Sequence, residues 1–250
     1  MLPCSRRYER VDCQQAACGN DSRRDSGCLA CKVRLASVCA SLSVEELEEL
    51  DALSHHTSFD AKETVFVQDH PAHSVYNIIE GMVRLYKLLP DGRRQIIGFA
   101  LPGDFLGLAM RDAFGFSADA VDSVSACAFS RSAYASLVNA KPHLLRRLHE
   151  FATHELTLAQ EQMMLLGRRS AEERVICFLL TMRDRWAKLG KPSVTVPLPM
   201  SRQDIADFLG LTIETVSRTF TKLAKDKTIL IVPDGVRLLN TGHMEMVAAA

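Results

Sequence analysis

The 250-residue sequence has neither a net charge nor a long apolar run. Lys and Arg together number 30, and Asp and Glu also number 30. Because these charges balance, bulk electrostatics neither favours nor excludes a nucleic-acid partner, which has to be argued from a local motif. The opening MLPCSRRYERVDCQQ has no apolar stretch typical of a signal peptide, and no later run is long enough to span a bilayer. We therefore expect a cytoplasmic protein with no membrane partner.

Cysteine, by contrast, is abundant, and three of the eight cysteines fall within GCLACKVRLASVC, at Cys28, Cys31 and Cys39. A chain of this length can bury a core without crosslinks, and clustered thiols in a reducing cytosol are more often metal ligands or redox groups than disulfides. Spacing alone does not separate zinc from an iron-sulfur cluster. A redox pair of Cys28 and Cys31 is a third alternative.

The sequence divides into four parts by composition and periodicity. The first 27 residues are polar and aperiodic, so we expect a flexible arm. Ser43, followed three residues later by Glu46, caps a short acidic helix. We expect the adjacent His55 and His56 to lie on this helix and to face solvent. The parts are an arm with the cysteine group (1–43), a β-rich domain (44–140), a long helix (141–168) and a C-terminal domain (169–250).

The β-rich part consists of short runs such as ETVFVQ and SVYNIIEG, separated by Pro-Asp-Gly and Pro-Gly-Asp turns. This spacing predicts an antiparallel barrel or roll. The helix that follows carries an apolar stripe at intervals of three and four residues, and a stripe of this length is typical of coiled-coil pairing between two chains. Packing on its own domain is the alternative. The stripe comprises Leu145, Leu148, Ala152, Leu156, Ala159, Met163 and Leu166.

The segment MSRQDIADFLGLTIETVSRTFTKLAKDKTI predicts a helix, a tight turn at Gly210 and a second helix. On the second helix Glu214, Ser217 and Arg218 share one face, at positions i, i+3 and i+4. Such a helix can present its side chains to base edges in the major groove. The alternative is a helix-stabilising surface pair of Glu214 with Arg218. We also expect the helix starts to contact double-stranded DNA, through Ser201, Arg202 and Thr212.

After this motif, ILIVPDGVRLLN predicts a hairpin that packs beside the helices as a wing. The order of cysteine group, roll, long helix and winged helix-turn-helix resembles the CRP/FNR family of bacterial transcription regulators, and GLTIETVSR resembles its FNR branch. The resemblance implies an α+β fold with a cyclic-nucleotide-binding-like β-roll, a dimerisation helix and a winged helix-turn-helix. It also implies a homodimer that reads a palindrome of TTGAT-like half-sites and contacts RNA polymerase, and no enzyme activity.

The same resemblance implies an oxygen-labile [4Fe-4S] cluster held by Cys28, Cys31, Cys39 and Cys127, the last from SVSACAFS. The gap between Cys31 and Cys39 resembles that of FnrN and FixK-like proteins, with Cys18 as the substitute for Cys39. Cyclic-nucleotide-binding members carry an Arg-Ser or Arg-Thr pair that is missing from AMRDAFGFSADAV, so we do not expect cAMP or cGMP. The alternative is a CRP-like regulator with another small effector, or a thiol or zinc switch.

Overall fold

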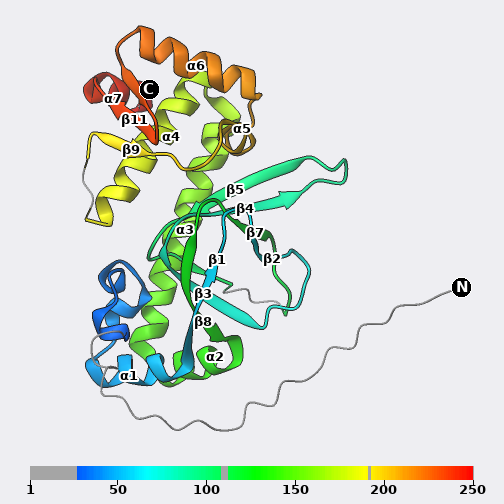
Figure 1. The fold of residues 1–250 in the computed structure, drawn as a ribbon, viewed down its shortest axis with the longest axis vertical. Coiled ribbons are helices and arrows are strands. Elements are labelled where there is room, and N and C mark those ends of the chain that lie inside the picture. Colours follow the sequence, from blue (N-terminus) through cyan, green and yellow to red (C-terminus); the bar gives the residue numbers. More distant parts are fainter. Residues whose placement is uncertain (1–26, 108–111, 191–192, 250) are drawn as a thin grey trace, which may run out of the picture.

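The computed structural model describes residues 27–107, 112–190 and 193–249, except for the side chain of Arg168. Almost all of the arm predicted for residues 1–27, with Cys4, Cys13 and Cys18, lies outside the described residues. The cysteine segment consists of three short 3-10 turns, which are η2 (Cys28–Ala30), η3 (Arg34–Ala36) and η4 (Val38–Ser41). These turns stack beside the lower half of the longest helix of the described chain (Figure 1).

Helix α1 (Val44–Leu53) begins at the predicted cap. The Ser43 hydroxyl accepts a hydrogen bond from the Glu46 amide, and the Glu46 carboxylate accepts one from the Ser43 amide. The helix ends earlier than the sequence indicated, because strand β1 (Ser54–Phe59) follows it at once. The prediction that His55 and His56 lie on the acidic helix is therefore wrong. Backbone pairing with β8 (Val124–Ser130) competes successfully with the helical conformation there.

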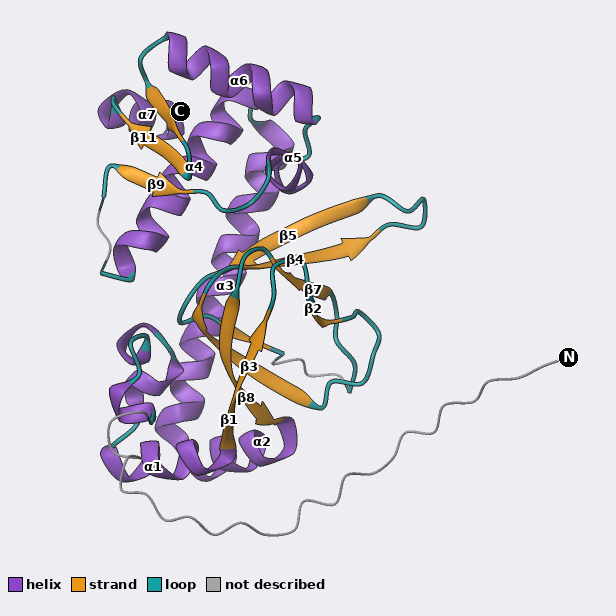
Figure 2. Cartoon of the chain, in the orientation of Figure 1, coloured by secondary structure: helices purple, strands orange, loops and turns teal. Residues whose placement is uncertain are grey.

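Two antiparallel four-stranded sheets form the roll, in the orders β1-β8-β3-β6 and β2-β7-β4-β5 (Figure 2). Their facing sides bury a core that includes Phe66, Ile78 and Phe114. This confirms the predicted antiparallel roll. The remaining strands of the roll are β2 (Thr64–Phe66), β3 (Ser74–Glu80), β4 (Val83–Leu88), β5 (Arg94–Ala100), β6 (Phe105–Leu106) and β7 (Ser117–Ala120).

Two helices lead out of the roll, α2 (Arg131–Ala140) and α3 (Pro142–Arg168). Pro142 occupies the first turn of α3, where its missing N–H leaves no intrahelical hydrogen bond unmade. Helix α3 follows the long axis of the molecule, with the cysteine segment beside its first half and the C-terminal domain beyond its second half (Figure 1). At about 1.5 Å per residue it carries the chain roughly 40 Å between the two.

The C-terminal domain is a winged helix-turn-helix. Gly235, at the start of the second wing strand, allows a close backbone approach, because a Cβ there would lie 2.1 Å from the carbonyl oxygen of Val196. The elements of this domain are α4 (Ala171–Lys188), β9 (Thr195–Pro197), α5 (Arg202–Leu209), α6 (Ile213–Lys225), β10 (Ile229–Val232), β11 (Gly235–Leu238) and α7 (Thr241–Ala249), with β10, β11 and β9 forming one sheet.

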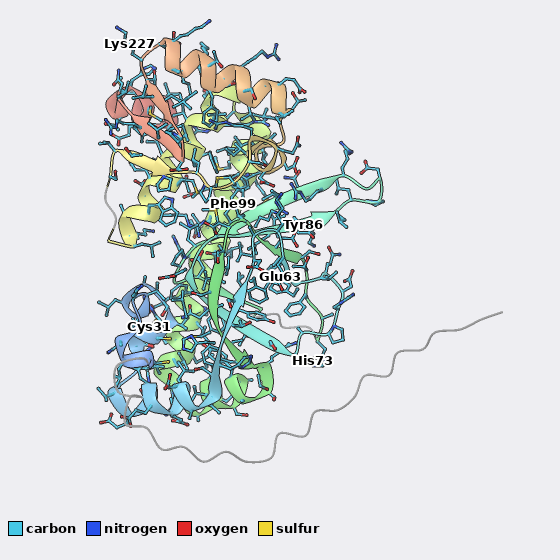
Figure 3. The ribbon with its side chains drawn as sticks, viewed as in Figure 1. Cys31, Glu63, His73, Tyr86, Phe99 and Lys227 are labelled. Atoms are coloured by element: carbon cyan, nitrogen blue, oxygen red, sulfur yellow. The ribbon has the colours of Figure 1, made fainter. Side chains whose placement is uncertain are left out.

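One hydrophobic core runs from the roll into this domain. Phe99 of β5 lies 5.5 Å from Phe208 of α5 and 6.4 Å from Phe178 of α4, measured between ring centroids. Met82 and Ile96 of the roll belong to the same cluster. Figure 3 places Phe99 at the junction of the two domains. The roll and the C-terminal domain are therefore joined by continuous packing as well as by the chain.

Candidate DNA-binding surface and cysteine site

Helices α5 and α6 meet at the predicted turn. Gly210 ends α5 with φ at +62° and ψ at +40°, a left-handed conformation that glycine adopts without steric cost. Thr212 then caps α6, since its hydroxyl accepts a hydrogen bond from the Thr215 amide at 3.2 Å. Val216 and Phe220 of α6 are buried against the domain core. The turn therefore holds α6 with one face packed and the other free.

The free face of α6 carries the predicted reading residues. Glu214, Ser217 and Arg218 are all exposed. The amide N–H at the helix start and the Thr212 hydroxyl, with the more distant Arg218, hold the pKa of Glu214 below its usual range. Glu214 is thus a carboxylate at neutral pH, able to accept a hydrogen bond from a cytosine amino group, while Arg218 can pair with a guanine.

The same face of α6 extends beyond the three residues predicted from the sequence. A shallow groove along α6 is lined by Ser217 and Arg218 and then by Thr221, Lys222, Lys225 and Asp226. Lys222 also forms an ion pair with Glu172 of α4. Thr221, Lys222 and Lys225 follow Ser217 or Arg218 by three, four, seven or eight residues. Residues at these intervals share one face of a helix, so the sequence contained the signal for this basic extension of the surface. Ammonium groups along it suit contacts with phosphates.

The residues predicted at the start of α5 are already engaged within the chain. The Ser201 hydroxyl accepts from the Asp204 amide and donates to the Asp204 carboxylate, at 3.1 and 2.7 Å. The Arg202 guanidinium lies over the ring of Phe220, 3.4 Å from its centroid, and burial lowers its pKa. Glu214, Ser217 and Arg218 are freely presented, whereas Ser201 caps α5 and Arg202 packs α5 against α6.

The second candidate site gathers four cysteines from separate parts of the chain. Cys28 lies in η2, Cys39 in η4 and Cys127 in β8, and all three are buried in one cluster with α1, α2 and the first turns of α3. Cys31, between η2 and η3, is half-buried. Figure 3 shows Cys31 in the lobe that lies beside α3, far from α6.

These thiols are electrostatic neighbours. Burial and then the thiols of Cys31 and Cys39 raise the pKa of Cys127 to about 12. Cys39 and Cys127 contribute in the same sense to the raised pKa of Cys28, after burial and the Asp51 carboxylate. All four predicted ligands thus interact, although Cys127 is distant in sequence. Without a cation the raised pKa values keep Cys28, Cys39 and Cys127 protonated at neutral pH, since a buried thiolate is unfavourable.

Asp51 of α1 was not foreseen as part of this site. Its carboxylate accepts a hydrogen bond from the Cys28 amide at 3.1 Å, which fastens η2 to α1. Among residues 27–107, 112–190 and 193–249, no three His, Cys, Asp or Glu side chains lie close enough to hold a single metal ion. Across the same residues, no helix is both long and apolar enough to cross a membrane.

The residues of the predicted apolar stripe on α3 fall into two groups, one packed within the chain and one exposed. Leu148 is only 9% exposed and packs in the cysteine-site cluster with Leu144, so the chain's own core covers it. Leu166, half-buried, approaches Gly210. These two residues follow the alternative of packing within the chain, because one periodicity serves both a core and a seam. The exposed members of the stripe are Leu145, Ala152, Leu156, Ala159 and Met163.

A network of ion pairs joins the roll to α5. Asp204, whose side chain is 4% exposed, lies 2.7 Å from Arg94 of β5 and 3.3 Å from Arg84 of β4. Arg94 also pairs with Asp207 at 2.9 Å, and Arg84 pairs with Asp119 of the roll at 3.1 Å. Ion pairs therefore hold the β4–β5 hairpin to α5, the first helix of the helix-turn-helix.

A β-roll that is packed on a winged helix-turn-helix, with a long helix between them, defines a two-domain bacterial transcription regulator. Residues 198–229 match the family described as bacterial regulatory proteins, crp family, and residues 56–141 match the cyclic nucleotide-binding domain.

The chain belongs to the CRP/FNR family. It is 56% identical to the transcriptional activatory protein AadR of Rhodopseudomonas palustris, over 88% of this chain and 92% of that protein. It is 52% identical to the nitrogen fixation regulation protein FixK of Bradyrhizobium diazoefficiens, over 89% and 94%. Among solved structures, FixK2 of Bradyrhizobium japonicum superposes with a TM-score of 0.74 at 37% identity, covering 79% of this chain and 98% of that one. These relatives are regulators and not enzymes.

Proposed function

We propose that this protein is a DNA-binding transcription activator that reads a palindrome of TTGAT-like half-sites as a homodimer. The observation that carries the proposal is the exposed face of α6, where Glu214, Ser217 and Arg218 stand on a helix that is capped, packed on α5 and continued by lysines. A relative named as a transcriptional activatory protein supports activation, which requires contact with RNA polymerase.

The exposed half of α3 supplies the dimer. Leu156 and Met163 are 59% and 65% exposed, and Ala152 and Ala159 continue the same face. Apolar side chains at this spacing lose their contact with water when a second copy of the helix packs against them. Two reading helices one DNA turn apart, roughly 34 Å, would then meet two half-sites together.

We further propose that activity responds to oxygen through a [4Fe-4S] cluster held by Cys28, Cys31, Cys39 and Cys127. Four thiols, each of which interacts electrostatically with at least two of the others, three of them buried, support the all-cysteine ligand set of such a cluster. When bound, the cluster would supply iron that offsets the negative charge of the four thiolates, and oxygen would oxidise it and break it down. Cys127 anchors the site to β8, and the N-terminal turns of α3 lie in the same buried cluster, so the ligands connect the cysteine segment to the dimer helix.

The test is anaerobic purification followed by an absorption spectrum and by iron, sulfide and zinc analysis. We expect a brown protein with iron and acid-labile sulfide that loses both in air. Cys127→Ser should lose iron and sulfide even without air. Cys177→Ser is the matched control, because Cys177 lies on α4 outside the site and should leave the cluster unchanged. Retention of full iron and sulfide by Cys127→Ser would refute the ligand assignment.

The competing sensors give different results in the same measurements. Zinc without sulfide identifies a zinc site, and a metal-free protein whose DNA binding changes with thiol reagents identifies a cysteine switch. A small-molecule effector would change DNA binding in air while metal content stays constant, and titration with cAMP is the first such trial. Cys18, which lies outside the described residues, is tested as a substitute for Cys39 by comparing Cys18→Ser with Cys39→Ser.

A further inference from the structure

A buried hydroxyl without a partner lies in the wall of the cysteine site. Tyr134 of α2 is 2% exposed, and among the described residues its hydroxyl makes no hydrogen bond. A buried unpaired hydroxyl is costly, so it marks a place where a partner belongs. The ring itself is held firmly, stacked 4.8 Å from Phe105 and tilted 5.6 Å from Phe129, between centroids.

The surroundings of this hydroxyl identify the missing partner. Tyr134 shares its buried cluster with Cys28, Cys39 and Cys127. After burial, Cys39 is the group that acts electrostatically on the hydroxyl and contributes to its raised pKa. A neutral phenol is a hydrogen-bond donor, and sulfur that carries negative charge is an acceptor. A protonated Cys39 thiol offers only a weak acceptor, whereas a thiolate in a metal cluster, or a cluster sulfide, offers a strong one.

A second buried polar atom on the same side of the sheet also lacks a partner among the described residues, but it is an acceptor, so it calls for a donor such as a water and not for cluster sulfur. Asn77 of β3 is opposite Cys127 in the strand register, so the two side chains project from one face. Asn77 is 2% exposed, and within the described part of the chain its Oδ1 atom has no hydrogen-bond partner. The wall around the thiols is therefore more polar than packing of the apo-protein requires.

We infer that Tyr134 is a positioning residue whose hydroxyl donates a hydrogen bond to a cysteine thiolate or sulfide of the bound cluster. This inference rests on the proposed cluster and goes beyond its four ligands. Hydrogen bonds to cluster sulfur stabilise the more negative, reduced state and raise the reduction potential. Tyr134 therefore sets how readily the site is oxidised, while the four cysteines set whether a cluster is held.

The experiment compares Tyr134→Phe with Tyr76→Phe in the full chain. Tyr76 is adjacent to Asn77 on β3 but packs on the opposite side, against Phe59 and Phe66, so its variant removes the same oxygen away from the cysteines. We expect Tyr134→Phe to hold iron and sulfide anaerobically, to have a more negative midpoint potential, and to lose its cluster in air roughly tenfold faster, the effect of one charge-assisted hydrogen bond. Tyr76→Phe should match the wild type in all three.

A measurement without the cluster separates this role from simple packing. In the apo-protein, Tyr134→Phe removes an unpaired polar atom, so its melting temperature should equal or exceed that of wild type. A buried water shared by Tyr134 and Asn77 would instead make the apo variant less stable, which would overturn the inference. A Tyr134→Phe protein that bleaches at the rate of Tyr76→Phe would also overturn it. A wild type without iron and sulfide would remove the proposed cluster as well, so the two failures are distinguishable.

Discussion

Replacement of Arg94 by alanine tests whether the roll holds the DNA-reading domain in place. Arg94 donates hydrogen bonds to Asp207 from Nε at 3.2 Å and from Nη2 at 2.9 Å, and from Nη2 to Asp204 at 2.7 Å. The side chains of Arg94 and Asp207 are 24% and 15% exposed, so both are largely shielded from solvent. Removal of one partner from a buried ion pair costs about 3–5 kcal/mol, chiefly because the other charge stays buried.

The expected loss lies below that range, because Asp204 keeps Arg84 at 3.3 Å and the Ser201 amide at 3.0 Å. We expect Arg94→Ala to cost about 2–3 kcal/mol, which lowers a melting temperature of a chain of this size by about 5–10 °C. Since the lost contacts join two domains, the calorimetric transition should also broaden or split as the C-terminal domain melts separately.

Arg93→Ala is the matched control for this experiment. Arg93 is the adjacent arginine on the same hairpin, its side chain is 78% exposed, and within the described part of the chain it pairs with Asp91, two residues away. We expect no change in melting temperature or in DNA affinity for this variant. If Arg94→Ala melts like Arg93→Ala in a single sharp transition, the ion pairs do not fix the arrangement of the two domains, and the reasoning fails.

Three further predictions concern the DNA surface, the dimer and the wing. Glu214→Gln should relax preference at one base pair of the half-site by roughly tenfold in gel-shift titrations. The selectivity of the wild type should stay constant from pH 8 to pH 5, because the lowered pKa of Glu214 keeps its carboxylate ionised over this range. Leu156→Glu should give monomers by light scattering, while Thr157→Glu, on another face of α3, should not. Gly235→Ala should cost about 2 kcal/mol or more in denaturant unfolding, while Gly242→Ala, with open space around its Cβ, should cost nothing. Unchanged selectivity, persistent dimers or an unaltered midpoint would contradict the respective prediction.

The helix-turn-helix could be predicted in detail because its signals are local. Ser201 and Thr212 cap their helices three residues ahead of the amides that they accept from, and Gly210 breaks α5 one residue past its end. Hydrogen bonds and backbone angles over such short separations follow directly from residue type. The presentation of Glu214 and Arg218 on the free face of α6 follows from helical geometry alone.

Contacts between distant segments could not be predicted in the same way. Nothing in the residues around Arg94 indicates that it pairs with Asp204, 110 positions later. Asp51 enters the cysteine site because α1 packs against η2, and Tyr134 enters it because α2 packs on β8 and β3. Leu148 shows the limit of periodicity. It belongs to the same apolar stripe as Leu156, but its own domain covers its side chain, whereas Leu156 is exposed.

The division of the apolar interior into three clusters has a consequence for how this architecture can diversify. The cysteine site belongs to one cluster, the inside of the roll to a second, and the junction of the roll with the DNA-reading domain to a third. Substitutions that abolish the thiols alter the first cluster and leave the contacts within the other two in place. A lineage can therefore exchange or discard its sensor without rebuilding its reader, so related chains with intact DNA recognition are free to answer to different signals.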